Sequence, residues 1–381
     1  MVKKRFLFAV VSILLVCVLL LGACANNSTT ATTTATTTAT TTATTTATTT
    51  ATTSSVSTVV LKTWDLKVAI SSSPLSPPGK TMQAVADRIT ELTDGRVTFK
   101  IFFSSSLIES KEVLRAVNEG VVDISDIYTN AAPGLMPLHD VLSLVGLGWP
   151  DTYNSALIIR EIEKMPAMQA EWQGVKVWNY SPYAVPTVLR TTEKIIKTEA
   201  DFKGLKIYGM SPAVAEFLSA LGAVPVFVPF EDMYMSMDKG IIEAQMSSQG
   251  SIHASGTFEL LKHYTNLNTT LVQTAVPLII CPSVWEEFDQ AVKDAFNTVE
   301  GEFMLTRYDL EMAAEEAGIQ EARENGVTFY DLPESELDNW LSYAKPQHQE
   351  WIDAVGGDAQ AVYDQLVSLI AQYKANPQPR P

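Results

Sequence analysis

The sequence predicts an α/β protein built from two similar lobes, and three observations support this prediction. Short apolar strands alternate with amphipathic helices in the order β-α-β-α-β between residues 66 and 124. The same order returns between residues 205 and 245, and a long helical stretch follows after residue 284. The alternative is one larger doubly wound domain, which would also alternate strands and helices.

The N-terminal segment, residues 1–23, has the pattern of a signal peptide that ends at a lipidated cysteine. Three basic residues precede an apolar run, and Leu21-Gly22-Ala23-Cys24 follows it. Small residues before a cysteine, with a leucine three positions upstream, resemble the lipobox of bacterial lipoproteins. That resemblance implies a diacylglyceryl group on Cys24 and attachment to the outer face of the cytoplasmic membrane. The other interpretation is an ordinary secretory signal with an incidental cysteine.

The next segment, residues 24–56, reads as a tether. Residues 29–53 consist of threonine and alanine alone, without charge or large apolar side chains. β-branched threonine disfavours helix, and the tract has nothing to bury. We expect a mobile spacer that spans roughly 25–30 Å as a flexible coil.

The charge of the chain excludes one class of function. The 381 residues carry a formal charge of −16, which becomes −19 when the three basic residues of the signal are removed. A nucleic-acid-binding face needs a basic patch that this composition does not supply. After residue 24, no apolar run approaches the roughly 18 residues of a spanning helix, which excludes a polytopic membrane protein.

The first β-α-β-α-β unit is delimited by glycines and by apolar spacing. Met82, Val85, Ile89 and Leu92 recur at helical spacing, and Gly95 closes that helix. The expected elements are strands over 66–70, 97–101 and 121–124, and helices before Gly95 and before Gly120.

The second unit repeats this plan with a clearer helix start. Ser211 is a suitable N-cap residue and Pro212 suits the first turn of a helix that stops at Gly222. The other expected elements are strands over 205–207, 224–228 and 241–244, and a short helix over 231–239.

The helical segment after residue 284 is expected to brace both lobes. Phe288, Val292, Phe296, Val299 and Phe303 recur at helical spacing between about 284 and 325. Such a stripe is typical of core packing rather than of a cofactor site.

Catalytic and metal-binding patterns are missing from the sequence. Its four histidines do not pair at metal-ligand spacing, and no nucleophile elbow, phosphate-binding loop or dinucleotide fingerprint occurs. Asp123 and Asp126 lie near a strand end, where carboxylates more often cap loops than catalyse. We therefore expect a binding protein without cofactor or metal, and not an enzyme.

Several motifs resemble TRAP (tripartite ATP-independent periplasmic) transporter solute-binding proteins of the DctP family. They are Leu92-Thr93-Asp94-Gly95-Arg96-Val97, Asp201-Phe202-Lys203-Gly204-Leu205-Lys206-Ile207, Ala220-Leu221-Gly222-Ala223-Val224-Pro225 and Asp238-Lys239-Gly240-Ile241-Ile242-Glu243-Ala244. The similarity extends over residues 64–370 in order and spacing. It implies a two-lobed periplasmic-binding-protein-like fold of type II, which captures a small organic solute between its lobes.

The resemblance also implies a domain plan and partners. Lobe 1 would span 57–180 and be completed by part of 270–381, lobe 2 would span 181–270, and long helices would occupy 284–381. The partners would be an organic acid, two integral-membrane permease subunits and, through the lipid, the membrane. Two other functions stay open: solute binding for an ATP-driven importer, and a surface-anchored hydrolase that uses Asp123 or Asp126.

The expected solute site departs from the family at one position. In the family, the residue after Gly-Leu-Lys-Ile is usually an arginine that holds a substrate carboxylate, and here it is Tyr208. Three interpretations follow. Arg190 supplies the charge instead, or the solute is neutral and contacts Tyr208, or Tyr208 makes no contact. The abundance of aromatic residues favours an acid with apolar or aromatic bulk over a sugar acid. The remaining candidates lie near expected strand ends: Ser71, Ser72, Tyr128, Trp149, Tyr180, Phe230, Gln245 and Ser247.

Overall fold

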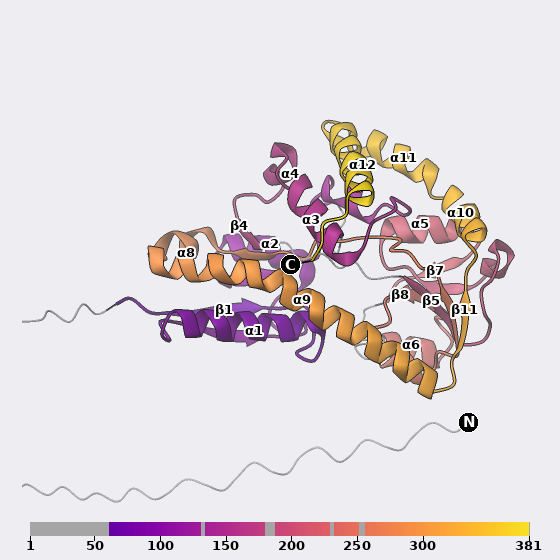
Figure 1. Cartoon of the computed structure of the whole chain (residues 1–381), viewed down its shortest axis with the longest axis horizontal. Helices are drawn as coiled ribbons and strands as arrows, with labels where there is room; N and C mark the ends of the chain where they lie inside the picture. The colour runs from indigo at the N-terminus through magenta and orange to yellow at the C-terminus, as the bar shows by residue number, and fades with distance from the viewer. Residues whose placement is uncertain (1–60, 131–133, 180–186, 229–231, 251–255, 381) are drawn as a thin grey trace, which may run out of the picture. The chain divides into compact units, whose positions relative to one another are not determined.

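The chain folds into two β-sheets that share one long helix (Figure 1). A computed structural model describes residues 61–130, 134–179, 187–228, 232–250 and 256–380. The expected signal peptide, Cys24 and the Thr/Ala tether lie outside the described residues, as do Tyr180 and Phe230.

Sheet 1 has five strands in the order β2-β1-β3-β10-β4. They are β1 (Trp64–Ala69), β2 (Val97–Phe102), β3 (Ile124–Asp126), β4 (Lys176–Asn179) and β10 (Leu278–Ile280). β1 runs parallel to β2 and β3, whereas β10 runs antiparallel to β3 and β4. β10, which follows the second unit in the chain, therefore returns to complete the first sheet.

Sheet 2 has six strands in the order β11-β9-β5-β8-β6-β7. They are β5 (Val188–Thr191), β6 (Lys206–Tyr208), β7 (Val224–Val226), β8 (Ala244–Ser247), β9 (His263–Asn266) and β11 (Thr328–Asp331). β6 is parallel to β7 and β8, and β5 is antiparallel to β8 and β9. The order β7-β6-β8 thus repeats the order β2-β1-β3 of sheet 1.

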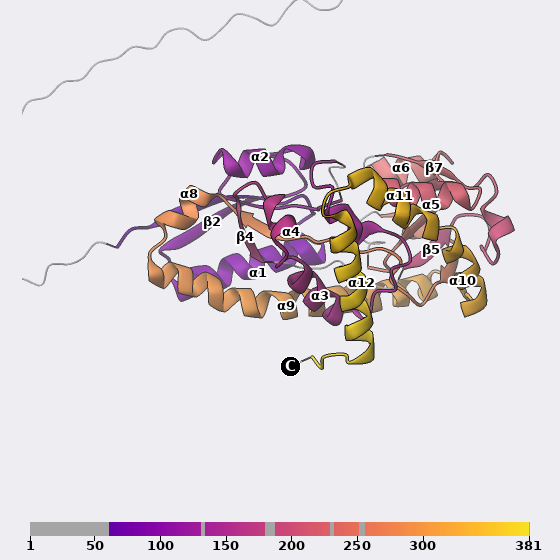
Figure 2. The same ribbon diagram turned by 90° about the horizontal axis from the view of Figure 1, so that it is seen from above.

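The helices cover both sheets and form a separate helical layer. They are α1 (Pro77–Leu92), α2 (Val113–Asn118), α3 (Thr152–Ile162), α4 (Pro166–Ala170), α5 (Pro212–Ala220), α6 (Met233–Asp238), α8 (Pro282–Glu287), α9 (Gln290–Glu324), α10 (Glu334–Ser342), α11 (Lys345–Val355) and α12 (Ala359–Ala375). Figures 1 and 2 both show α9 alongside α1 and then passing on toward sheet 2.

The expected α/β fold with repeated units is confirmed, and its local signals act as expected. The hydroxyl of Ser211 accepts a hydrogen bond from the Val214 amide at 3.3 Å, and Pro212 stands in the first turn of α5. α1 begins in the same way, because Ser76 accepts from the Gly79 amide.

Two strand starts and one residue of a helix face differ from the sequence-based expectation. β3 and β8 begin at Ile124 and Ala244 rather than at residues 121 and 241. Val121 and Ile241 lie in the turns before these strands, 50% and 47% exposed, so apolar character alone misplaced the strand starts. Leu92 ends α1 at 38% exposure and is not part of its buried face. The strands β9 and β11 were not anticipated.

The aromatic stripe of α9 packs against sheet 1, as expected. Phe296 and Phe303 lie in the same core cluster as Val68 of β1 and Ile89 of α1. The Trp178 indole donates a hydrogen bond to the Phe296 carbonyl oxygen at 3.1 Å, which ties β4 to the helix. The first half of α9 is therefore part of the core of sheet 1.

Candidate functional site

The carboxyl edge of sheet 1 carries a buried carboxylate held by a serine. Ser71 follows β1, and Asp126 ends the neighbouring strand β3. The Ser71 amide donates to Oδ1 of Asp126 at 2.9 Å, and the Ser71 hydroxyl donates to Oδ2 at 2.8 Å. Burial raises the pKa of Asp126 to about 6, although these two bonds and the positive charge of Arg307 oppose the rise.

Two further candidates lie at the same edge. The hydroxyl oxygens of Ser72 and Tyr128 are 3.1 Å apart, which is hydrogen-bonding distance. Burial raises the pKa of the Tyr128 hydroxyl, whereas the charge of Arg307 lowers it. The fold thus gathers Ser71, Ser72 and Tyr128 beside Asp126, at the edge where parallel sheets bind ligands.

The middle of α9 contributes buried charge between the two sheets. Arg307 and Glu311 are each 4% exposed and lie one helical turn apart. Nη2 of Arg307 is 2.6 Å from Oε1 of Glu311, and Nε donates to the same oxygen at 2.7 Å. Because Arg307 also acts electrostatically on Asp126, α9 connects this ion pair to the edge of sheet 1.

Three of the candidates in sheet 2 form a row across the strands. Arg190 in β5 pairs with Gln245 of β8 on one side and with Tyr264 of β9 on the other. Directly opposed residues of antiparallel strands point to the same face of a sheet. β6 pairs with β8 at Ala244, which puts Tyr208 beside Gln245, one residue further along. Tyr208, Gln245 and Arg190 therefore share one face.

Ser247 belongs to the same face of β8, because it stands two residues after Gln245. It pairs with Val188 of β5 and is partly buried. The Gln245 amide nitrogen donates to the Thr257 hydroxyl at 2.9 Å. Gln245 is thus held in place, and Ser247 stands at the carboxyl end of its strand.

Arg190 is enclosed between sheet 2 and α9. Its side chain is fully buried, and its guanidinium carbon lies 5.8 Å from the centroid of the Tyr264 ring. Its charge acts on Glu315 of α9, whose carboxylate accepts from the amides of Gln249 at 2.9 Å and Gly250 at 2.7 Å. Burial raises the pKa of Glu315, and these two N–H donors and the Arg190 charge lower it.

A cavity of about 320 Å³ lies next to this group, between sheet 2 and α9. Gln249, Glu315, Met312 and Phe329 are among the residues that line it. Gln249 is 4% exposed, and its Oε1 has no hydrogen-bond partner among the described residues. Buried acceptors are usually paired, so this oxygen is a candidate for contact with a hydrogen-bond donor.

Trp149 is placed differently from the other described candidates. It is 4% exposed in a helical cluster with Ile158 of α3 and Leu366 of α12. Its environment is therefore the core of the helical layer rather than the strand-end groups described above.

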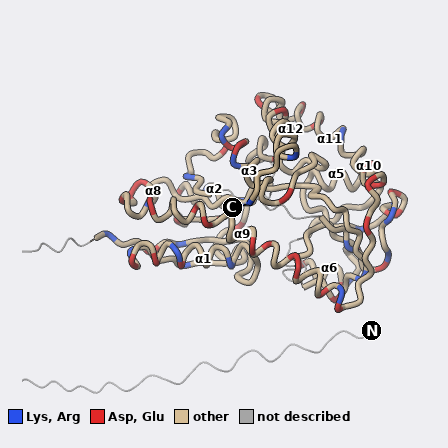
Figure 3. Tube along the Cα trace, viewed as in Figure 1, with Lys and Arg blue, Asp and Glu red and all other residues tan. Residues whose placement is uncertain are grey.

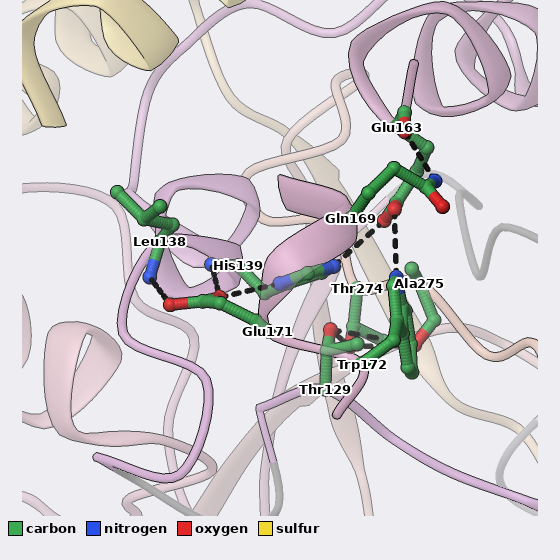
Figure 4. Close-up of polar contacts among 9 residues, drawn as sticks. All are labelled: Thr129, Leu138, His139, Glu163, Gln169, Glu171, Trp172, Thr274 and Ala275. Carbon is green, nitrogen blue, oxygen red and sulfur yellow. Dashed lines mark hydrogen bonds and ion pairs between the residues drawn. The ribbon is translucent and has the colours of Figure 1, made fainter. Parts of the chain in front are cut away.

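The helical layer also contains a buried charged cluster (Figure 4). His139 is fully buried between Glu163 and Glu171, with Nε2 2.9 Å and Nδ1 2.6 Å from their carboxylate oxygens. The Trp172 indole donates to the other oxygen of Glu163 at 3.0 Å. Burial lowers the pKa of His139, but the two carboxylates outweigh it and raise the pKa to about 9. The cluster is a structural ion pair that joins Glu171 to the turn at His139.

Across the five described ranges, no group of three or more His, Cys, Asp or Glu side chains is arranged to hold a metal ion. No helix within those ranges is long and apolar enough to cross a membrane. Acidic and basic residues are interspersed along the trace, as Figure 3 shows.

Sequence reasoning missed the charged residues of α9. Arg307, Glu311 and Glu315 continue the helical spacing of Phe296 and Phe303, so they extend the same buried stripe. Charged residues at stripe positions were the available signal, because a buried charge must be paired. They mark the point at which the helix leaves the core of sheet 1.

Comparison with known proteins places the chain in a family. The family model for DctP, the bacterial extracellular solute-binding proteins of family 7, matches residues 68–354. A curated relative is the C4-dicarboxylate-binding periplasmic protein DctP of Rhodobacter capsulatus. It is 22% identical over 300 residues, which cover 75% of this chain and 86% of the relative.

Solved structures show the same fold. A TRAP solute-binding protein from a marine metagenome, specific for aromatic acids and crystallised with 3-hydroxybenzoate, aligns with a TM-score of 0.75 at 19% identity. The alignment covers 82% of this chain and 99% of that one. A TRAP solute-binding protein from Rhodoferax ferrireducens with benzoate aligns with a TM-score of 0.74 at 21% identity, covering 82% and 99%.

Proposed function

The chain belongs to family 7 of the bacterial extracellular solute-binding proteins, the DctP family of TRAP transporter receptors, and we propose that its solute is a small organic acid. The protein is an extracytoplasmic solute receptor rather than an enzyme. In the proposed complex the carboxylate of the acid is held by Arg190, and the rest of the solute faces the edge of sheet 1.

Arg190 is the observation that carries this proposal. A guanidinium binds a carboxylate through two parallel hydrogen bonds, and the bonds strengthen where water is excluded. Arg190 is fully buried in the row with Tyr208 and Gln245, on the family's solute-binding fold. Tyr208, which replaces the arginine expected from the family, can donate a hydrogen bond but supplies no charge.

Two lobes are proposed to close on the solute. In this proposal, lobe 1 over 57–180, completed by part of 270–381, would hold sheet 1 with its strand β10. Lobe 2 over 181–270 would hold sheet 2 except for β11, and α9 would serve both lobes. A solute that contacts both sheet edges stabilises the closed state by its extra contacts there. The closed receptor would then deliver the acid to the two integral-membrane permease subunits.

The expected lipid anchor is part of the same proposal. Lipid on Cys24 would hold the receptor at the membrane, and residues 24–56 would let the folded part reach the permease. Replacing Cys24 with alanine is expected to move the protein from the membrane fraction to the soluble fraction and to abolish palmitate labelling. Palmitate labelling that persists in C24A would contradict the anchor without affecting the solute proposal, whereas membrane retention alone would not, because the apolar run of an uncleaved signal also holds a protein in the membrane.

Ligand-dependent stabilisation tests the solute proposal. A ligand that binds only the folded protein raises the melting temperature. Purified full-length protein is expected to be stabilised by benzoate, 3-hydroxybenzoate or short aliphatic acids, but not by the corresponding amides. Arg190→Gln is expected to weaken acid binding by about a hundredfold or more, because a charged bidentate contact is lost.

Arg160→Gln is the matched control for the loss of one arginine. Arg160 pairs with Glu300 at 2.7 Å and is partly exposed, remote in sequence from the strand-end candidates. Circular dichroism without ligand establishes that both variants fold. Unchanged acid binding in a folded R190Q protein would overturn the role of Arg190, and stabilisation by amides alone would overturn the acid.

A further inference from the structure

The two sheet edges differ in the charge they offer a solute. At the edge of sheet 1, Asp126 and Glu311 are two buried acids, and Arg307 is the basic residue that acts on both. With Arg307 already bonded to Glu311, this group carries a net negative charge when all three residues are ionised. A second carboxylate of a solute would enter this group against repulsion.

The same edge is suited to a hydrogen-bond donor. Each oxygen of Asp126 accepts one bond from Ser71, and a carboxylate oxygen can accept two. Acceptor capacity therefore remains on Asp126. The hydroxyls of Ser72 and Tyr128 stand beside it and can either donate or accept.

An independent observation on sheet 2 points to the same chemistry. The buried Oε1 of Gln249 has no partner among the described residues, and Gln249 is one of the residues that line the 320 Å³ cavity beside Glu315. Leaving a buried acceptor unpaired costs free energy that a donor on a bound molecule would recover. Both sheets thus offer acceptors, and Arg307, the other buried arginine of these groups, is already bonded to Glu311.

We infer that Asp126 and Gln249 select a monocarboxylic acid that carries a hydroxyl or N–H donor, and that they exclude dicarboxylic acids. The inference rests on the proposed binding of an acid at Arg190. It separates this chain from the curated relative named for C4-dicarboxylates. A hydroxyl donor and an ammonium donor share the required chemistry, and the experiment below distinguishes them.

Two matched sets of acids test the inference by calorimetry on the full-length protein. The aliphatic set is 4-hydroxybutyrate, 4-aminobutyrate and succinate, which differ only in the group opposite the carboxylate. The aromatic set is 3-hydroxybenzoate, 3-aminomethylbenzoate and isophthalate. In at least one set, the hydroxyl or amine member is expected to bind at least about tenfold more tightly than the dicarboxylate.

Asp126→Asn keeps the shape of the side chain and removes its charge. It is expected to reduce the ratio of affinities between the donor-bearing acid and the dicarboxylate by about tenfold. If the natural donor is an ammonium, the amine should lose more affinity than the alcohol. Asp65→Asn is the control, because Asp65 is an exposed residue near the amino end of β1 and its loss changes the net charge equally. Gln249→Met is expected to weaken the donor-bearing acids only.

The outcomes separate this inference from the proposed function. If a dicarboxylate binds as tightly as its donor-bearing partner, or if D126N leaves the ratio of affinities unchanged, the selection by Asp126 is wrong and acid binding stands. If neither set binds at all, the proposed acid function fails and the inference fails with it. If D65N reduces this ratio of affinities as much as D126N does, the effect is one of general charge and the inference is also overturned.

Discussion

Sheets 1 and 2 share a strand order but end in opposite chemistry. In each, the first strand of the unit lies between the second and third, and an antiparallel strand from elsewhere in the chain joins the third. Yet the edge of sheet 1 centres on Asp126, whereas the row across sheet 2 centres on Arg190. The repeated scaffold thus holds the two unlike halves of the proposed site, which suits a solute with two unlike ends.

The repeat is most exact away from the candidate site. Before β3, the Asp123 carboxylate accepts from the Lys67 amide, and Lys67 Nζ donates to the Val121 carbonyl. Before β8, the Glu243 carboxylate accepts from the Lys206 amide, and Lys206 Nζ donates to the Gly240 carbonyl. In both units, a lysine and an acid therefore join the first strand to the turn before the third strand. This repetition indicates that the two pairs have a structural role.

The largest effect is expected when the charged group of Arg307, Glu311 and Asp126 is broken. Arg307→Leu would leave Glu311 and Asp126 buried without their basic partner, so the free energy of unfolding should fall by about 3–5 kcal/mol at pH 7. Urea unfolding measures it. Arg160→Leu, which removes a partly exposed pair, should cost no more than about 1 kcal/mol. Equal effects would show that the middle of α9 is not a special junction.

A second prediction concerns the charged cluster around His139 in the helical layer. The pKa of His139 is raised from 6.5 to about 9 in the folded protein, so the folded state binds the proton more tightly. This stabilisation, roughly 3 kcal/mol, is fully present below pH 6.5 and is lost as the pH rises toward 9.

Unfolding free energies at pH 6, 7.5 and 9 check this dependence. Glu163→Gln removes one of the two carboxylates beside His139 and should flatten the decline. A wild-type protein with the same decline as E163Q would contradict the assignment of the proton to His139.

The third prediction compares the two halves of α9. At Gly318 an added Cβ would lie 2.5 Å from the Gln249 carbonyl oxygen, which is backbone and cannot turn away. Gly318→Ala should therefore destabilise the protein by about 1–3 kcal/mol. At Gly301 of the same helix, no atom lies within 4 Å of an added Cβ. Gly301→Ala should stabilise by up to about 1 kcal/mol, and differential scanning calorimetry would detect the opposite signs.

The smallest effects are expected at the repeated lysines. Lys206 and Glu243 are 3.1 Å apart with side chains 42% and 36% exposed, so Lys206→Ala should cost at most about 1 kcal/mol. Lys67→Ala should cost a similar amount, because Lys67 also donates to a backbone carbonyl in the turn before the third strand, one residue further along. If the free energy of unfolding falls by several kcal/mol for one lysine variant alone, the contacts of Lys67 and Lys206 are not equivalent.

Much of the fold was predictable because its signals are local. The N-cap at Ser211, the glycine stops and the aromatic stripe of α9 each depend on neighbours within a few residues. The strands β9 and β11 escaped prediction, since β11 pairs with a partner 65 residues earlier and lies at the edge of sheet 2. Non-local pairing leaves little trace in the pattern of a four-residue strand.

The candidate site was predictable in part. Strand ends pointed to Ser71 and Tyr128, and the departure at Tyr208 pointed to Arg190. The position of Trp149 in a helical core could not be read from its place in the chain. Arg307 and Glu311 were missed because a sequence alone does not show which face of a charged helix is buried.

The sequence by itself determined the repeated α/β units, their caps and the family, because these depend on periodicity, turn residues and short motifs. Tertiary structure decided which charges meet. Asp126 from β3 and Arg307 from α9 are far apart in the chain and act on each other only because α9 passes the edge of sheet 1. Burial then makes the contact matter, because the interaction between two charges is stronger in a low-dielectric environment than in water.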